Sequence, residues 1–159
     1  FSIAAKSIIS ESIYERLPLQ GAISVGKSYT SSSHTMFLGS AFVEAYEYCD
    51  AQNWIGLLIT PSASKELEKH EISPMYDDFR RHDIPRRKNA PTGYDAENTY
   101  AYRFQNDADS FKSQIVGRLL ELQQLAPNER AKCKYDHTIK FIEKHYKTIE
   151  IQTNVEFSF

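Results

Sequence analysis

The sequence predicts an α/β (α+β) fold, in which helices pack on a mixed sheet and a helical hairpin lies near the C-terminus. Short apolar segments bounded by glycine or proline have the length of strands, and they alternate with segments of helical periodicity. Near the C-terminus, Pro127 separates two amphipathic segments, which is typical of two antiparallel helices. The 159 residues have the length of a single domain, 1–159.

Helices are expected where apolar residues recur every three or four positions. The first runs from Ala4 to Leu17 and is ended by Pro18, which disfavours helical backbone at the residue before it. The next runs from Ser40 to Gln52, and its periodicity predicts a buried face made of Phe42, Ala45, Tyr46 and Cys49. The other helices are expected at 62–69, 107–125 and 128–146.

Strands are expected in six places, and the longest apolar one is Trp54 to Thr60. Its nearly continuous apolar run indicates a central strand that is covered on both faces. The last eleven residues, 149–159, alternate apolar and polar side chains at period two, which predicts an extended strand. The other strands are expected at 20–29, at 37–39, near 80–87 and at 99–104, with a hydroxyl-rich loop at 30–34.

The composition excludes several function classes. Hydrophobic residues make up 41% and charged residues 25%, with a formal net charge of −2, which is typical of a globular protein and argues against a nucleic-acid binder. No apolar run reaches membrane-spanning length, so no membrane partner is expected. Cys49 and Cys133 both fall on predicted helices, which favours reduced, buried thiols and a cytoplasmic protein.

Three motifs have a possible chemical meaning and a plainer structural one. Gly21-x-x-x-x-Gly26-Lys27-Ser28 matches the phosphate-binding P-loop formally, but Ala22 to Val25 are predicted as a strand and no helix follows, so a hairpin is favoured. Arg86 and Arg87 have the fork geometry that grips a triphosphate, although a solvated charged loop is also compatible. Cys133 and His137 share a helical face, but two ligands do not make a zinc site.

Two blocks of the sequence resemble the class III nucleotide cyclase catalytic domain. The first is the glycine-bounded segment 20–29, and the second is 37–47, in which a strand breaks at Gly39 and opens into a helix. Segments 53–63 and 134–142 resemble the following strand and the closing helix of that domain. The match is nearest to the stand-alone bacterial branch that includes the pyrimidine cyclases of anti-phage defence.

The resemblance implies a homodimer with shared sites, which converts a nucleoside triphosphate to a cyclic monophosphate and pyrophosphate with Mg²⁺ or Mn²⁺. In the family, two aspartates on earlier strands bind the metal. No acid of this chain ends an apolar strand, so no metal site is assigned here. Because the sequence begins at Phe1 rather than Met, we expect the metal-binding strands to precede it. On this expectation the chain alone does not turn over nucleotide.

Family positions also suggest site residues on the helix that follows Gly39. The family's transition-state Asn and Arg correspond to Val43 and Glu47, and neither of these side chains can donate the hydrogen bonds that stabilise phosphoryl charge. The acidic side chains at and beside these positions, Glu44 and Glu47, are the candidate catalytic residues. The alternative is that they form the solvated face of the helix. The candidate nucleotide contacts are Met36 at the base-reading position, Phe37, Arg86 and Arg87. The alternative function is an inactive cyclase-homology module that binds a nucleotide or a protein partner.

Overall fold

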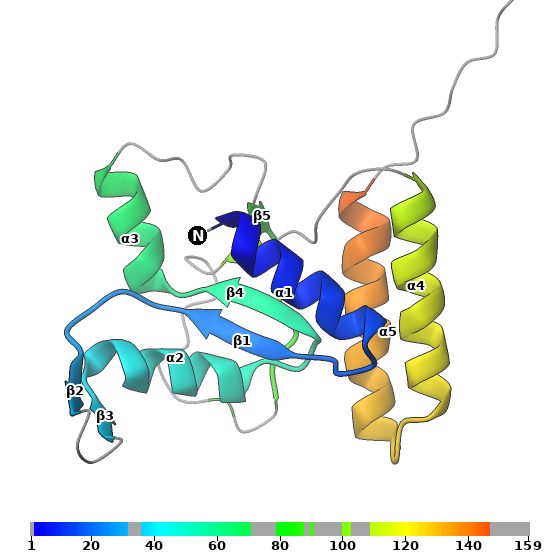
Figure 1. Cartoon of the computed structure of the whole chain (residues 1–159), viewed down its shortest axis with the longest axis horizontal. Coiled ribbons are helices and arrows are strands. Elements are labelled where there is room, and N and C mark those ends of the chain that lie inside the picture. The colour runs from blue at the N-terminus through cyan, green and yellow to red at the C-terminus, as the bar shows by residue number, and fades with distance from the viewer. Residues whose placement is uncertain are drawn as a thin grey trace, which may run out of the picture.

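The computed structural model describes residues 2–31, 36–70, 79–87, 90, 100–102 and 109–146. These residues form helices and small sheets of the general α+β class (Figure 1). In chain order the elements are α1 (Ser2–Tyr14), β1 (Gln20–Ile23), β2 (Tyr29–Ser31), β3 (Met36–Leu38), α2 (Ser40–Ala51), β4 (Gly56–Ile59), α3 (Pro61–Lys69), β5 (Phe79–Arg81), β6 (Tyr100–Tyr102), α4 (Asp109–Gln124) and α5 (Glu129–His145).

The larger sheet is mixed and has the strand order β1-β4-β6-β5. β1 and β4 are parallel, with Gln20 opposite Gly56, and β6 is antiparallel to both β4 and β5. β4 is therefore an inner strand, and Leu58 and Ile59 are almost fully buried although they point to opposite faces. The prediction of a central, doubly covered strand is confirmed.

The strand predicted over residues 20–29 is wrong in its second half. β1 ends at Ile23, and the hairpin is made by β2 and β3, which form a separate two-stranded antiparallel sheet. The chain leaves the larger sheet because its polar groups bond to helices: Ser24 Oγ donates to Ala41 O at 2.5 Å, and Val25 N donates to Ser62 Oγ at 3.0 Å. Residues 24–28 thus form a loop between β1 and β2.

Two glycines let this loop lie directly on the start of α2. Gly39 has φ +138°, and a Cβ atom there would lie 2.1 Å from the carbonyl oxygen of Lys27. A Cβ on Gly26 would lie 2.8 Å from Ser40 Oγ. Since only glycine fits so close an approach, these two residues fix the position of α2 against the loop.

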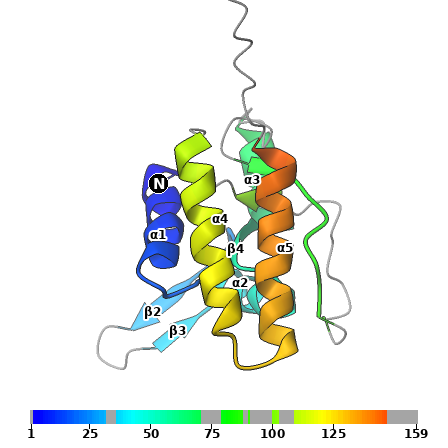
Figure 2. The same cartoon turned by 90° about the vertical axis from the view of Figure 1, so that its right-hand side faces the viewer.

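The main core lies between the larger sheet and helices α1, α4 and α5. α4 packs against both α1 and α5, and Figure 2 shows the three helices in front of the sheet. Trp54 and Phe141 are both fully buried at its centre, with their rings in an edge-to-face arrangement and centroids 5.1 Å apart. Residues 125–128 join α4 to α5, and the Asn128 side chain caps α5 by accepting from Ala131 N at 2.9 Å.

Two fully buried polar side chains tie distant elements to the start of β4. Gln52 Nε2 donates to Gly21 O at 2.9 Å, while Gln52 Oε1 accepts from Trp54 Nε1 at 2.5 Å. Thr138 of α5 accepts from Ile55 N at 2.8 Å, and its Oγ1 lies 3.0 Å from the carbonyl oxygen of Ile55. Both residues satisfy backbone groups that would otherwise be buried without a partner.

The predicted buried face of α2 is wrong. Phe42 and Tyr46 are 41% and 74% exposed, and the buried residues of α2 are Tyr48 and Ala51. The close contact at Gly39 fixes the rotation of α2 about its axis, so the periodicity of its apolar residues alone does not decide which of them are buried. Both cysteines lie on helices and are free, but Cys133 is exposed, so its predicted burial is wrong as well.

The described helices lie close to their predicted positions. The expected strands at 80–87 and 99–104 correspond to the shorter β5 and β6. The predicted strand at 149–159 lies outside the described residues. No helix among the residues described has the length and apolar character needed to cross a membrane.

Candidate functional site

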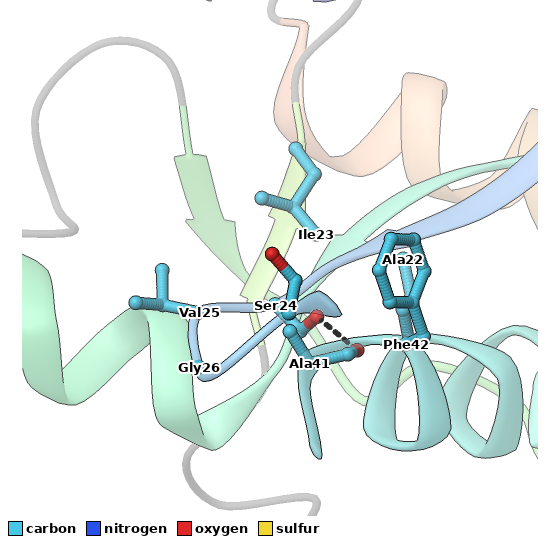
Figure 3. Close-up of a pocket in the computed structure, with 9 residues that line it drawn as sticks. Ala22, Ile23, Ser24, Val25, Gly26, Ala41 and Phe42 are labelled. Carbon is cyan, nitrogen blue, oxygen red and sulfur yellow. Dashed lines mark hydrogen bonds between the residues drawn. The ribbon is translucent and has the colours of Figure 1, made fainter. Parts of the chain in front are cut away.

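A cavity of about 480 Å³ opens where β1 ends, between the loop 24–28 and the first turns of α2 (Figure 3). This volume lies within the range of small-molecule sites. Its lining combines residues of β1, of the loop and of α2: Ala22, Ile23, Ser24, Val25, Gly26, Ser28, Ala41, Phe42 and Ala45.

Small side chains and one aromatic ring give the cavity its chemical character. Ala22, Ala41 and Ala45 leave the space open, and the Phe42 ring, 41% exposed, forms one wall. Phe42 also lies 5.7 Å, centroid to centroid, from Phe37 of β3. An aromatic wall beside open space is suited to a flat, apolar ligand group such as a heterocyclic base.

The first turn of α2 also borders the cavity through Ala41 and Phe42. This 12-residue helix has Gly39 as its N-cap and no side-chain hydrogen bond at the cap. Ser24 and Ser28 place two hydroxyl groups in the lining, and the Ser24 hydroxyl bonds the loop to Ala41 O, as Figure 3 shows. The loop 24–28 covers this helix N-terminus, because Ala41 N donates to Lys27 O at 3.4 Å.

Glu44, a predicted catalytic residue, binds the N-terminal turn of α3. Its carboxylate accepts from Ser62 N at 3.2 Å and from Ser62 Oγ. The same Ser62 hydroxyl accepts from Val25 N at 3.0 Å, so one contact joins α2, α3 and the loop 24–28. The carboxylate supplies the capping interaction that the N-cap residue Thr60 does not make with its own side chain. The structure therefore gives Glu44 a structural role.

The other predicted residues of the corner lie near Glu44 but not in one cluster. Met36 and Phe37 belong to β3, which packs against α2, and the Phe37 side chain is 59% exposed. Glu47 is exposed on α2 and does not line the cavity. Phe37 meets the cavity wall through Phe42, and it is the predicted contact that the structure brings to the site.

Arg86 and Arg87 lie at the other end of α2. Arg87 N donates to Ala51 O at 2.8 Å, and Arg87 Nη1 bonds to Asp50 Oδ1 at 2.5 Å. Phe42 and Asp50 are eight residues apart on this helix, which corresponds to about 12 Å along its axis. The two arginines are therefore not part of the cavity.

Sequence reasoning missed most of the lining residues. Ala22, Ser24, Ala41 and Ala45 were assigned to strand or helix faces without any chemical role. The available signal was the spacing of small residues at alternate positions before Gly26 and at i, i+4 after Ser40. The formal P-loop match is explained by the same loop, which leads into strand β2 rather than into a helix.

The described residues contain no group of three or more His, Cys, Asp or Glu side chains that could hold a metal ion. We assign no step to a metal.

Comparisons of this chain with protein-family models, with curated proteins and with solved structures found no match.

Proposed function

We propose that this chain is a nucleotide cyclase-like domain, and that it binds a nucleoside triphosphate in the cavity beside α2. The observation that carries the proposal is the cavity itself, which combines an aromatic wall and two hydroxyl groups within about 480 Å³. A base stacks on Phe42, and the Ser28 hydroxyl donates to a phosphate oxygen. The order of the blocks around Gly26 and Gly39, which resembles class III cyclases, supports the same ligand.

In the reaction that this resemblance implies, a ribose hydroxyl attacks the α-phosphorus. A new O–P bond forms, the bond to the β-phosphate oxygen breaks, and pyrophosphate leaves while the hydroxyl loses its proton. The residues at the transition-state positions, Val43 and Glu47, cannot donate hydrogen bonds to the phosphoryl oxygens. Their chemistry supports nucleotide binding more strongly than it supports cyclisation.

The second candidate function is therefore a binding module that performs no reaction. It is favoured by one specific observation: the carboxylate of Glu44 is engaged by Ser62 and caps α3. This carboxylate is held at the start of α3, and Glu44 does not line the cavity. Mass spectrometry for a cyclic nucleotide product, after incubation with each of four triphosphates, separates the enzyme from the binding module.

The binding proposal is tested by calorimetric titration of the chain with ATP, GTP, CTP and UTP. Ala45→Leu fills the cavity, and Phe42→Ala removes its aromatic wall. Both variants should weaken binding about tenfold, because stacking on an aromatic ring contributes about 1–3 kcal/mol. Leu120→Ala is the matched control, since Leu120 is an exposed apolar side chain on α4 that does not line the cavity. Equal affinities for all four proteins would reject the cavity as the site.

The proposal includes a homodimer formed through an exposed apolar surface on β2, β3 and α2, here called the hairpin patch. Its large apolar side chains are between 41% and 74% exposed, and the rings of Phe37 and Phe42 lie 5.7 Å apart, centroid to centroid. Association of two copies through this patch would bury them next to the cavity. The members of the hairpin patch are Tyr29, Phe37, Leu38, Phe42, Val43 and Tyr46. We also propose a cytoplasmic location, which suits the two free thiols.

A further inference from the structure

Two cationic residues, one of them from the loop after β5, border the last turn of α2, and a third shares a helix face with the other. Arg87 comes from this loop, and its backbone amide is anchored to Ala51 O at the end of α2. Arg130 and Lys134 are four residues apart on α5 and therefore share one face of that helix. We call these three residues the basic corner. It lies at the opposite end of α2 from the cavity.

Lys134 is half-buried and is held in place by an uncharged partner. Its ammonium group donates to Gln20 Oε1 at 2.5 Å, and Gln20 Nε2 in turn donates to Cys49 O at 2.6 Å. This chain of hydrogen bonds fixes the position of the ammonium nitrogen without neutralising it. Among the residues that the structure describes, no carboxylate bonds to this ammonium group, which leaves a half-buried cation without a charged partner.

The nearby negative charge is already engaged by another cation. Asp50 Oδ1 bonds to Arg87 Nη1 at 2.5 Å, so this carboxylate is shared between Arg87 and the rest of the corner. Burial lowers the pKa of Lys134, and the charges of Arg87 and Arg130 lower it further. Cys49 and Asp50 raise this pKa by less, so the net shift is downward. Arg87 Nε is buried and makes no hydrogen bond in the described structure. The corner therefore holds an excess of positive charge.

We propose that the basic corner is a binding site for a phosphate-bearing anion. Guanidinium and ammonium groups form short, charge-assisted hydrogen bonds to phosphate oxygens, and a half-buried setting strengthens them. Arg87 and Lys134 both border the last turn of α2, and Arg130 lies one helical turn from Lys134. Among the described residues, Arg87 is bonded to a carboxylate and the other two cations are not, so an anion would supply negative charge beside them. The inference does not depend on the proposed nucleotide cavity, because no residue of the corner lines it.

The test uses inorganic pyrophosphate as the probe, titrated into the whole chain by calorimetry at low ionic strength. Lys134→Gln keeps a hydrogen-bonding group near Gln20 but removes the charge, and it should weaken pyrophosphate binding about tenfold. Lys134→Arg keeps the charge and should stay within about threefold of the natural protein. The matched control is Lys140→Gln, which removes an exposed charge from the same helix and should change affinity less than about twofold.

A second readout follows the ammonium group directly. Anion binding should raise the pKa of Lys134, measured by NMR of the lysine side chains, and leave Lys140 unchanged. Equal loss of affinity in Lys134→Gln and Lys140→Gln would overturn the proposal, because it would indicate general charge attraction only. Failure of the natural chain to bind pyrophosphate would overturn it as well. The cavity variant Ala45→Leu separates the two proposals, since it should weaken nucleoside binding and leave pyrophosphate binding intact.

Discussion

Replacing Glu44 by alanine should destabilise the fold, because its carboxylate caps α3 from a different helix. The variant removes the acceptor of two hydrogen bonds, from Ser62 N and from Ser62 Oγ. The Ser62 hydroxyl keeps its contacts with Val25 N and Thr60 Oγ1, but the amide of Ser62 loses the partner described here. The effect should therefore concentrate on α3 and on the loop 24–28, which Ser62 connects.

The magnitude follows from the type of contact. Loss of a helix N-cap costs about 0.5–2 kcal/mol, and a hydrogen bond to a charged group contributes about 1.5–3 kcal/mol. Glu44 is only half-buried, so water compensates part of the loss. We expect Glu44→Ala to lower the free energy of unfolding by about 1–2 kcal/mol.

The assay is a double-mutant cycle in urea, with Glu44→Ala, Ser62→Ala and the double variant. The two single effects should not add, and the coupling energy should be about 1 kcal/mol, since each variant removes the same contact. Glu47→Ala is the matched control: it removes an acid from the exposed face of the same helix and should change stability by less than about 0.5 kcal/mol. A coupling energy near zero, or an equal loss in Glu44→Ala and Glu47→Ala, would refute the capping role.

Three further predictions concern other parts of the molecule. Gly39→Ala should destabilise the chain by at least about 2 kcal/mol, because the residue has φ +138° and its new methyl group would overlap backbone; melting at the natural temperature would contradict this. Burial, and second the charge of His145, lower the pKa of His82 in the folded chain to about 4. The unfolded chain therefore binds a proton at a higher pH than the folded chain, and the free energy of unfolding should fall as the pH drops from 6.5 to about 4. After a discount for the partial exposure of His82, the loss is about 1–2 kcal/mol, and denaturation of His82→Gln should depend less on pH over this range. The hairpin patch should produce dimers at tens of micromolar, an order typical of weak association, and Phe37→Ser together with Tyr46→Ser should abolish them; light scattering that finds the natural chain monomeric argues against the patch as an interface.

Local signals in the sequence were sufficient to predict most of the helices and the inner strand. Pro61 and Pro127 mark helix boundaries at which the structure also starts a helix or a connection. The run from Trp54 to Thr60 predicts β4 because a nearly continuous series of apolar residues suits a strand that is buried on both faces. At the end of α1 the signal was weaker. Arg16, rather than a glycine, adopts positive φ there, and the helix ends at Tyr14, before the predicted Leu17.

The candidate site was harder to predict because its geometry depends on contacts between distant segments. Glu44 and Ser62 are 18 residues apart, and neither helix pattern alone indicates that one caps the other. The rotation of α2 depends on the contact of Gly39 with Lys27, and the pattern of apolar residues in the sequence does not indicate this contact. A cavity exists only where several small residues meet, so single positions such as Ala45 carry no signal of their own.

The bond between Thr138 and Ile55 has a consequence for the kinetics of folding. The two residues are 83 positions apart, and the buried amide of Ile55 has its partner on α5. At a synthesis rate of about 5–20 residues per second, the start of β4 leaves the ribosome several seconds before α5 exists. During that interval the apolar run of β4 has no cover from α5, and the amide of Ile55 lacks the partner that it has in the folded chain. The buried bond that joins β4 to α5 therefore forms only after α5 has been synthesised.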